Sequence, residues 1–285
     1  MKIKQIIRFF RPINCVIAAL AGTVGLFLCS ETAAAGLALH FSVFLSVFFI
    51  TGYGNAQNDI IDHKSDKINH SKRPLPTGVI SLREALTAAF FLLVAGLLSA
   101  LSAGFRYLTA AAAVSFILFL YNAFLKKTVF IGNAAVASVS AFTFIYGPGG
   151  EIGYISDSKS LIPCYAAAGF AFLIHFLREI YKDIEDVQGD RKYGVKTAPV
   201  KFGEKKSALM AAGVSLLLIP IFAWTASQEV FSGAFYIIAV PGVLLPVIIM
   251  AIRTAYLPSL AGKTAKLMKP VMAAGIAAAL AGVYL

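Results

Sequence analysis

Residues 39–62 read LHFSVFLSVFFITGYGNAQNDIID, an apolar run that ends in a cluster of polar side chains. Residues 39–57 contain no Asp, Glu, Lys or Arg. An uncharged stretch of this kind matches the ~20 residues that a helix needs to cross the ~30 Å hydrocarbon layer of a membrane. Asp59 and Asp62 follow directly. The stretch therefore predicts a transmembrane helix that carries carboxylates at one membrane face.

Similar apolar runs recur along the whole chain, which is 59% hydrophobic and only 14% charged. A soluble domain of 285 residues needs far more polar surface than this composition supplies. We therefore expect an all-α, polytopic protein of the cell membrane. The predicted spans are 12–29, 39–57, 85–104, 107–125, 129–147, 161–177, 208–224, 235–252 and 269–285.

The net charge of +11 is distributed unevenly between the segments that join these spans. With the N-terminus in the cytoplasm, 23 of the 25 Lys and Arg residues fall in cytoplasmic segments. Cytoplasmic loops of membrane proteins are enriched in basic residues in this way. The pattern predicts nine spans in an N-in, C-out orientation, and no nucleic-acid partner is needed to explain the charge. Those segments are 1–11, 58–84, 126–128, 178–206 and 253–269.

Two aspartate-rich segments repeat each other. Residues 59–66 read DIIDHKSD and residues 183–190 read DIEDVQGD, so both follow the pattern D-x-x-D-x-x-x-D. Both are expected in long cytoplasmic loops, 58–84 and 178–206. Four predicted spans separate them, and an even number returns the chain to the same face. This arrangement indicates two repeats of four helices, with a ninth span left over.

The spacing of the aspartates indicates a cation site. If the second span continues as a helix, Asp59, Asp62 and Asp66 share one stripe about 100° wide with Asn58. In the second motif Asp183, Asp186 and Asp190 share a stripe, whereas Glu185 faces the opposite side. Carboxylates this close repel each other unless a cation binds between them. Oxygen ligands without His or Cys indicate Mg²⁺.

The ligand class follows from what surrounds these carboxylates. Mg²⁺ and nearby Lys and Arg side chains suit a diphosphate, and an apolar bundle suits a long hydrocarbon tail. Together they indicate a polyprenyl diphosphate. The alternatives are a solvated charged loop, a calcium loop, which has a different ligand spacing, and a cation-coupled transporter. Transport sites usually lie near the bilayer midplane, whereas these aspartates lie at helix ends.

At this point the chain resembles the UbiA superfamily of intramembrane prenyltransferases. The resemblance rests on both aspartate motifs and on short segments that accompany them. These segments are Arg11-Pro12-x-Asn14, Arg73-Pro74-Leu75-Pro76-Thr77-Gly78, Tyr121-x-x-x-x-Lys126-Lys127 and Gly194-Val195-Lys196-Thr197. The resemblance implies one intramembrane prenyltransferase domain over 1–285, a nine-helix bundle around a central cavity, and Mg²⁺-dependent transfer of a prenyl group from its diphosphate.

The resemblance also implies roles for individual residues. The two motifs supply the metal ligands Asp59, Asp62, Asp66, Asp183, Asp186 and Asp190. The catalytic set is Asn58, Asp62, Asp66, Asp186 and Asp190. The residues implied for the diphosphate are Arg73, Lys126 and Lys127, and those implied for a lipid-like acceptor are Asn14, Tyr121, Arg191 and Lys196.

Residues 178–186, REIYKDIED, further resemble the archaeal ether-lipid branch of this superfamily. That resemblance implies transfer of a geranylgeranyl group from geranylgeranyl diphosphate to the free hydroxyl of geranylgeranylglyceryl phosphate. Branches that act on an aromatic quinone precursor or a chlorophyll-type acceptor share the other motifs and remain the alternative.

Overall fold

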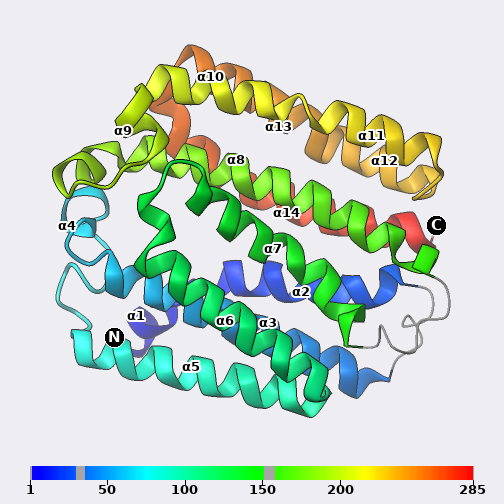
Figure 1. The fold of residues 1–285 in the computed structure, drawn as a ribbon, viewed down its shortest axis with the longest axis horizontal. Helices are drawn as coiled ribbons and strands as arrows, with labels where there is room; N and C mark the ends of the chain where they lie inside the picture. Colours follow the sequence, from blue (N-terminus) through cyan, green and yellow to red (C-terminus); the bar gives the residue numbers. More distant parts are fainter. Residues whose placement is uncertain (1, 30–35, 151–157, 285) are drawn as a thin grey trace.

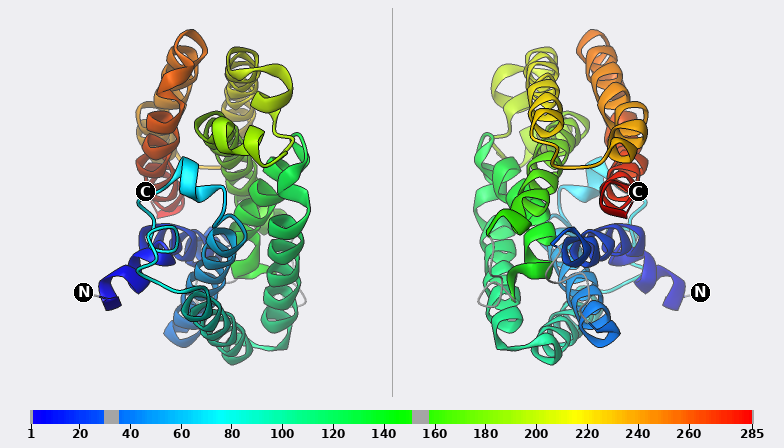
Figure 2. Two further views of the ribbon diagram at one scale, coloured as in Figure 1. Left: turned by 90° about the vertical axis from the view of Figure 1, so that its left-hand side faces the viewer. Right: turned by 90° about the vertical axis from the view of Figure 1, so that its right-hand side faces the viewer.

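The computed structural model describes residues 2–29, 36–150 and 158–284, and every regular element within these ranges is a helix (Figure 1). The longer helices run side by side along the longest axis, and the end-on views show one bundle (Figure 2). The all-α prediction is confirmed for these residues. The elements are α1 (Lys2–Phe9), α2 (Pro12–Leu28), α3 (Leu37–Ile61), α4 (Asp66–Asn69), α5 (Leu82–Ala103), α6 (Phe105–Ala123), η1 (Leu125–Lys127), α7 (Ile131–Gly149), η3 (Ser158–Leu161), α8 (Ile162–Lys192), α9 (Ala198–Phe202), α10 (Glu204–Ser215), α11 (Leu218–Ser227), α12 (Gly233–Ala239), η4 (Val240–Leu244), α13 (Leu245–Tyr256), η5 (Pro258–Leu260) and α14 (Ala261–Tyr284).

Within the described ranges, seven helical segments are long and apolar enough to cross a membrane. They are α3, α5, α6 with η1, η3 with α8, α10 with α11, α12 with η4 and α13, and η5 with α14. Beside them, α2 is a shorter apolar helix of 17 residues and α7 has 19. The chain is therefore a multi-pass membrane protein. The count of nine spans, the four-helix repeats and the N-in, C-out orientation stay predictions.

Large apolar side chains on the outside of the bundle agree with a lipid surrounding. Phe41, Phe90, Phe105, Phe116 and Ile237 are each at least 60% exposed. In water such a surface is unfavourable, but acyl chains are as apolar as these side chains. Meanwhile the helices satisfy the hydrogen bonds of their own backbone, which a spanning segment must do.

Helices α2 and α7 cross at glycines and bring two far-apart segments into contact. A Cβ atom at Gly25 would lie 2.3 Å from the Phe144 carbonyl oxygen, and one at Gly147 would lie 2.4 Å from the Gly22 carbonyl oxygen. No side chain larger than hydrogen fits at either place. Small residues at such crossings let membrane helices approach closely.

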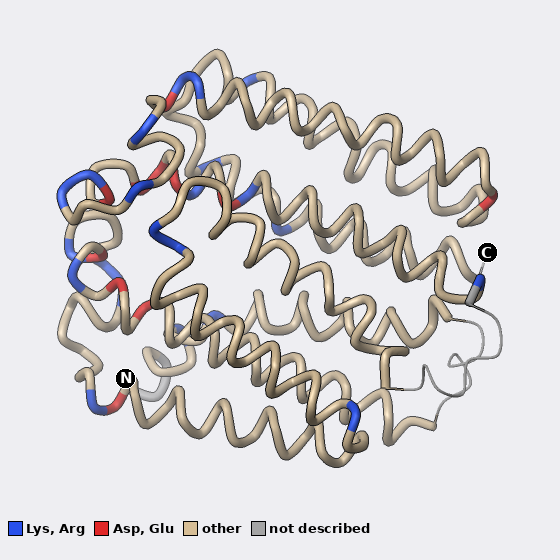
Figure 3. Tube along the Cα trace, in the orientation of Figure 1, with Lys and Arg blue, Asp and Glu red and all other residues tan. Residues whose placement is uncertain are grey.

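The charged residues gather at one end of the bundle, around α4, α9 and the C-terminal end of α8 (Figure 3). Two segments there differ from the expected loops. Residues 178–192 continue α8, because their apolar positions Ile180, Ile184 and Val187 are buried at helical spacing. Likewise α14 begins at Ala261, ahead of the span expected at 269–285. The expected loops 178–206 and 253–269 were therefore wrong in part, whereas the helical stripe expected for residues 183–190 agrees with α8.

Candidate active site

The first aspartate motif lies where α3 ends and α4 begins. Asp59 is in the last turn of α3, Asp62 caps the C-terminal end of that helix, and Asp66 opens α4. The expected continuous helix through Asp66 is wrong, because residues 62–65 form turns between the two helices. These turns bring Asp59 and Asp66 to the same guanidinium, and their side chains are only 3% and 4% exposed.

Each carboxylate of this motif contacts a basic side chain. Arg73 Nη1 donates to Asp59 Oδ1 at 3.2 Å and to Asp66 Oδ2 at 2.6 Å. Arg11 also pairs with Asp59, and Lys126, from η1, pairs with Asp62. Hydrogen bonds between ionised partners are about twice as strong as neutral ones. The first motif is therefore held by three cations from three different segments.

Burial and neighbouring charges act against each other at Asp66 and Arg73. Burial raises the pKa of Asp66, and the Arg73 guanidinium opposes that effect only in part. For Arg73, burial works to lower the pKa, but the carboxylates of Asp59 and Asp66 outweigh it and raise the pKa above its ordinary value. Arg73 therefore stays charged, and the buried carboxylates depend on a cation beside them.

The second motif lies on the C-terminal part of α8, and its partners are different. Asn133 Nδ2 donates to Asp183 Oδ2 at 2.8 Å, and the Thr197 hydroxyl donates to Asp190 Oδ2 at 3.3 Å. Asp186 Oδ1 lies 2.9 Å from His70 Nε2. Glu185 points away from these three residues to the exposed side, where Lys266 Nζ lies 3.6 Å from its Oε1.

Asn69 joins the two motifs. Its amide Nδ2 donates to the Asp186 carbonyl oxygen at 3.0 Å, and its Oδ1 accepts from the Gly189 backbone N–H at 2.9 Å. A Cβ atom at Gly189 would lie 2.4 Å from Asn69 Nδ2, so only glycine leaves room for this contact. Two segments that are 120 residues apart are thus held against each other at the charged end of the bundle.

The donor set of both motifs fits a hard divalent cation. Asp183 and Asp190 accept hydrogen bonds from neutral groups and keep lone pairs free for a metal. In the part of the chain that the structure describes, no three His, Cys, Asp or Glu side chains converge on one point. Arg11, Arg73 and Lys126 contact the carboxylates of the first motif, so a metal bound there would share these carboxylates with basic side chains.

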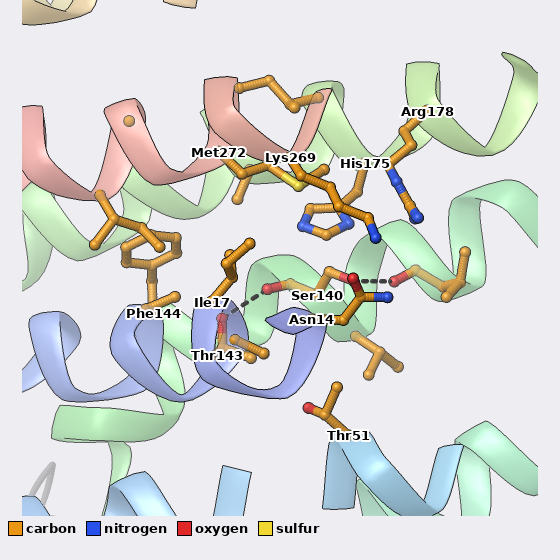
Figure 4. A pocket seen from close by; sticks show the side chains of 18 of the residues that line it. Asn14, Ile17, Thr51, Ser140, Thr143, Phe144, His175, Arg178, Lys269 and Met272 are labelled. Atoms are coloured by element: carbon orange, nitrogen blue, oxygen red, sulfur yellow. Dashed lines mark hydrogen bonds between the residues drawn. The ribbon is translucent and has the colours of Figure 1, made fainter. Parts of the chain in front are cut away.

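A cavity opens beside the motifs and runs into the bundle (Figure 4). Its polar end is lined by Asn14, Asn58, Tyr121 and Arg178, among other residues. Farther in, the lining is apolar and comes from α2, α7, α8, α11, α12 and α14. The apolar residues include Ile17, Ala21, Phe144, Phe170, Phe222, Phe235, Val243 and Ile276. A molecule with a charged head and a hydrocarbon tail matches this division.

The structure separates the four residues expected at the acceptor. Asn14 and Tyr121 line the cavity, whereas Arg191 and Lys196 are exposed and do not.

Among the residues expected at the diphosphate, Arg73 and Lys126 contact the first motif, and Lys127 is exposed. Asn58 donates from Nδ2 to Asn122 Oδ1 at 3.1 Å, which holds it at the cavity wall.

Several residues of the site were not predicted from the sequence. Arg11 belongs to a quoted motif without a role of its own, and its backbone adopts φ 57°, ψ 65°, a strained conformation for a residue other than glycine. His70 and Asn133 contact aspartates of the second motif. Lys269 lies at a predicted span boundary, yet it lines the cavity. For Lys269 the available signal was its place at the start of a predicted span, since a charged residue inside a membrane segment indicates function.

Residues 15–281 match the model of the UbiA prenyltransferase family. The chain belongs to this family. It is a membrane-embedded prenyltransferase. The family thus favours prenyl transfer over cation transport as the activity of this chain.

Individual members of the family extend the similarity to nearly the whole chain. Digeranylgeranylglyceryl phosphate synthase of Pyrococcus furiosus is 34% identical over 282 residues, covering 99% of this chain and 98% of the relative. A solved structure of digeranylgeranylglyceryl phosphate synthase superposes with a TM-score of 0.71 at 30% identity, covering 99% and 98%. A UbiA homolog from Archaeoglobus fulgidus, bound to GPP and Mg²⁺, has the same fold, with a TM-score of 0.68, 21% identity and coverage of 99% and 100%.

Proposed function

We propose that this prenyltransferase moves a geranylgeranyl group from geranylgeranyl diphosphate to the free hydroxyl of geranylgeranylglyceryl phosphate. The second ether bond of an archaeal membrane lipid would form in this reaction. The observation that carries the proposal is that two joined aspartate motifs lie beside an apolar cavity whose polar end is lined by Asn58 and by Arg11, the partner of Asp59. The similarity to digeranylgeranylglyceryl phosphate synthases over nearly the full chain supports the choice of acceptor.

In this proposal the six aspartates would hold Mg²⁺, and the bound ion would supply positive charge that stabilises the departing diphosphate. Arg73 and Lys126 bind diphosphate oxygens, because they are the cations already placed among the aspartates. Asn58 fixes the first motif through Asn122. The site faces the cytoplasm, where the predicted topology puts both motifs.

The bond between C1 of the prenyl chain and the diphosphate oxygen breaks, and its electron pair stays on the diphosphate. The acceptor hydroxyl oxygen forms the new bond to C1, and its proton passes to the released diphosphate. An allylic cation at C1 needs protection from water during this step. Phe144, Phe170 and the other apolar side chains that line the cavity exclude water, and aromatic rings stabilise a nearby cation.

Mass spectrometry of the product tests the proposal. Purified protein in detergent is supplied with geranylgeranyl diphosphate, Mg²⁺ and geranylgeranylglyceryl phosphate, and in parallel with an aromatic quinone precursor. We expect the ether product from the first mixture, none from the second and none in EDTA. Product from the aromatic acceptor alone would overturn the choice of acceptor and leave the family assignment intact.

A further inference from the structure

The polar end of the cavity carries a group of cations that the aspartate chemistry does not use. Arg178 and Lys182 come from α8 and Lys269 comes from α14, and all three line the cavity. Figure 4 shows Lys269 and Arg178 directed toward the same space, next to Asn14 from α2 and His175 from α8. They lie within helices that are apolar enough to span a membrane. Charged side chains in such helices are costly unless a partner or a function accounts for them.

One carboxylate in this group offsets only part of the charge. Glu179 is 8% exposed and accepts from Arg178 Nη1 at 2.9 Å and from Lys182 Nζ at 2.6 Å. Among the described residues, no carboxylate oxygen lies within ion-pair distance of Lys269 Nζ, and the cations Arg178 and Lys182 line the same cavity. Arg178, Lys182 and Lys269 together with Glu179 leave a local net charge of about +2.

Hydrogen-bond donors in the group also remain free. Arg178 Nε is buried and has no acceptor within the described part of the chain. A guanidinium offers five N–H donors and an ammonium offers three, so Glu179 leaves donors of Arg178 and Lys182 unused. A buried donor without an acceptor is unfavourable, because it has lost its hydrogen bonds to water. The group is thus prepared for an anion that brings several oxygen acceptors.

We propose that Arg178, Lys182 and Lys269, with Asn14, form a second anion site that binds the phosphate monoester of the acceptor. A phosphate monoester carries about −1.5 to −2 charges at pH 7, which matches the local net charge. This inference rests on the proposed function, since it names the group that holds the same acceptor. It replaces Arg191 and Lys196, which are exposed and do not line the cavity.

The two anion sites then divide the substrates. The prenyl diphosphate binds at the aspartates with Arg73 and Lys126, and the acceptor phosphate binds at the neighbouring cations of α8 and α14, Lys269 among them. Their tails share the apolar part of the cavity, and the acceptor hydroxyl lies between the two charged heads. Geometry of this kind raises the rate because the reacting atoms are held close together.

Lys269→Met is the decisive variant, because methionine keeps most of the length of the side chain and suits an apolar helix. Lys266→Met is the matched control, since Lys266 is exposed on the same helix and is absent from the cavity lining. The readout is kcat/KM for geranylgeranylglyceryl phosphate and for geranylgeranylglycerol, which lacks the phosphate, together with KM for the prenyl diphosphate. Binding of the phosphorylated acceptor is measured separately by isothermal titration.

We expect Lys269→Met to raise KM for the phosphorylated acceptor by about tenfold or more and to remove most of the preference over the dephosphorylated acceptor. KM for the prenyl diphosphate should change less than about twofold, and Lys269→Arg should restore the preference. Lys266→Met should behave like the unaltered protein.

Other outcomes overturn the assignment. A rise confined to KM for the prenyl diphosphate would mean that these cations hold the diphosphate. An unchanged preference for the phosphorylated acceptor in Lys269→Met would mean that its phosphate binds elsewhere. If the unaltered protein binds the phosphorylated acceptor through Lys269 but makes no ether product, the proposed function fails and the anion site stands.

Discussion

The two aspartate motifs have the same spacing and opposite surroundings. In the first, a helix ends at Ile61 and the carboxylates contact Arg11, Arg73 and Lys126. In the second, α8 continues unbroken and two of three carboxylates accept hydrogen bonds from neutral side chains. The repeated spacing thus specifies where the carboxylates lie, and the side chains that contact them determine what each motif can bind. The first motif has cations ready for phosphate oxygens, and the second has free lone pairs ready for a metal.

The largest expected effect is a difference in activity between substitutions on the two faces of the second motif. Asp186→Ala should lower kcat/KM by at least about 100-fold, the size found when one charge-stabilising group is removed. Glu185→Ala should stay within about twofold, because Glu185 lies on the exposed side with Lys266. Radiolabelled prenyl transfer measures both. Equal losses in the two variants would contradict the assignment of Asp186 to the site.

The second prediction concerns the dependence of the two ligands on each other. Carboxylates and diphosphate repel until a cation lies between them, so Mg²⁺ should raise the affinity for geranylgeranyl diphosphate by about tenfold or more. The diphosphate must raise the affinity for Mg²⁺ by the same factor. Isothermal titration of the diphosphate at several Mg²⁺ concentrations measures this coupling. Tight binding in EDTA, unchanged by Mg²⁺, would leave the diphosphate to Arg73 and Lys126 alone.

The third prediction tests the cations of the first motif. Arg73→Gln should raise KM for the prenyl diphosphate by roughly 10- to 100-fold, since it removes charge-assisted hydrogen bonds. Lys127→Gln is the control, because Lys127 is exposed, whereas its neighbour Lys126 pairs with Asp62. Steady-state kinetics with varied diphosphate measures the change. A loss in Lys127→Gln equal to that in Arg73→Gln would mean that net charge, rather than position, binds the diphosphate.

The smallest effect concerns the contact that joins the two motifs. Gly189→Ala should displace Asn69, whose Nδ2 lies 2.4 Å from the position that the new methyl group would take, and remove its hydrogen bonds to α8. We expect about 1–2 kcal/mol of lost stability and a few-fold lower kcat. Gly213→Ala is the control, because a methyl group there meets open space. Thermal unfolding in detergent and prenyl-transfer assays measure both variants. An unchanged kcat in Gly189→Ala would show that the two motifs act without this contact.

Local patterns in the sequence were sufficient for the helical membrane fold, for both aspartate motifs and for the outward position of Glu185. Each depends on neighbours within a few turns, because helical periodicity and apolar length are local properties. The family resemblance carried by short motifs placed Asn14 and Tyr121 at the acceptor, and both line the cavity. The local patterns ended α8 too early, since a charged segment can stay helical when one of its faces is buried.

Only the tertiary structure decided which charges meet. Arg11 pairs with Asp59 across 48 residues, Lys126 pairs with Asp62 across 64, and Asn69 reaches Gly189 across 120. No periodicity connects such positions, because the packing of separate helices sets the distances between them. For the same reason Lys269 looks like a membrane boundary in the sequence and lies in the cavity wall in the structure. The sequence by itself thus determined the helices and the chemistry they carry, and the packing determined which side chains share a site.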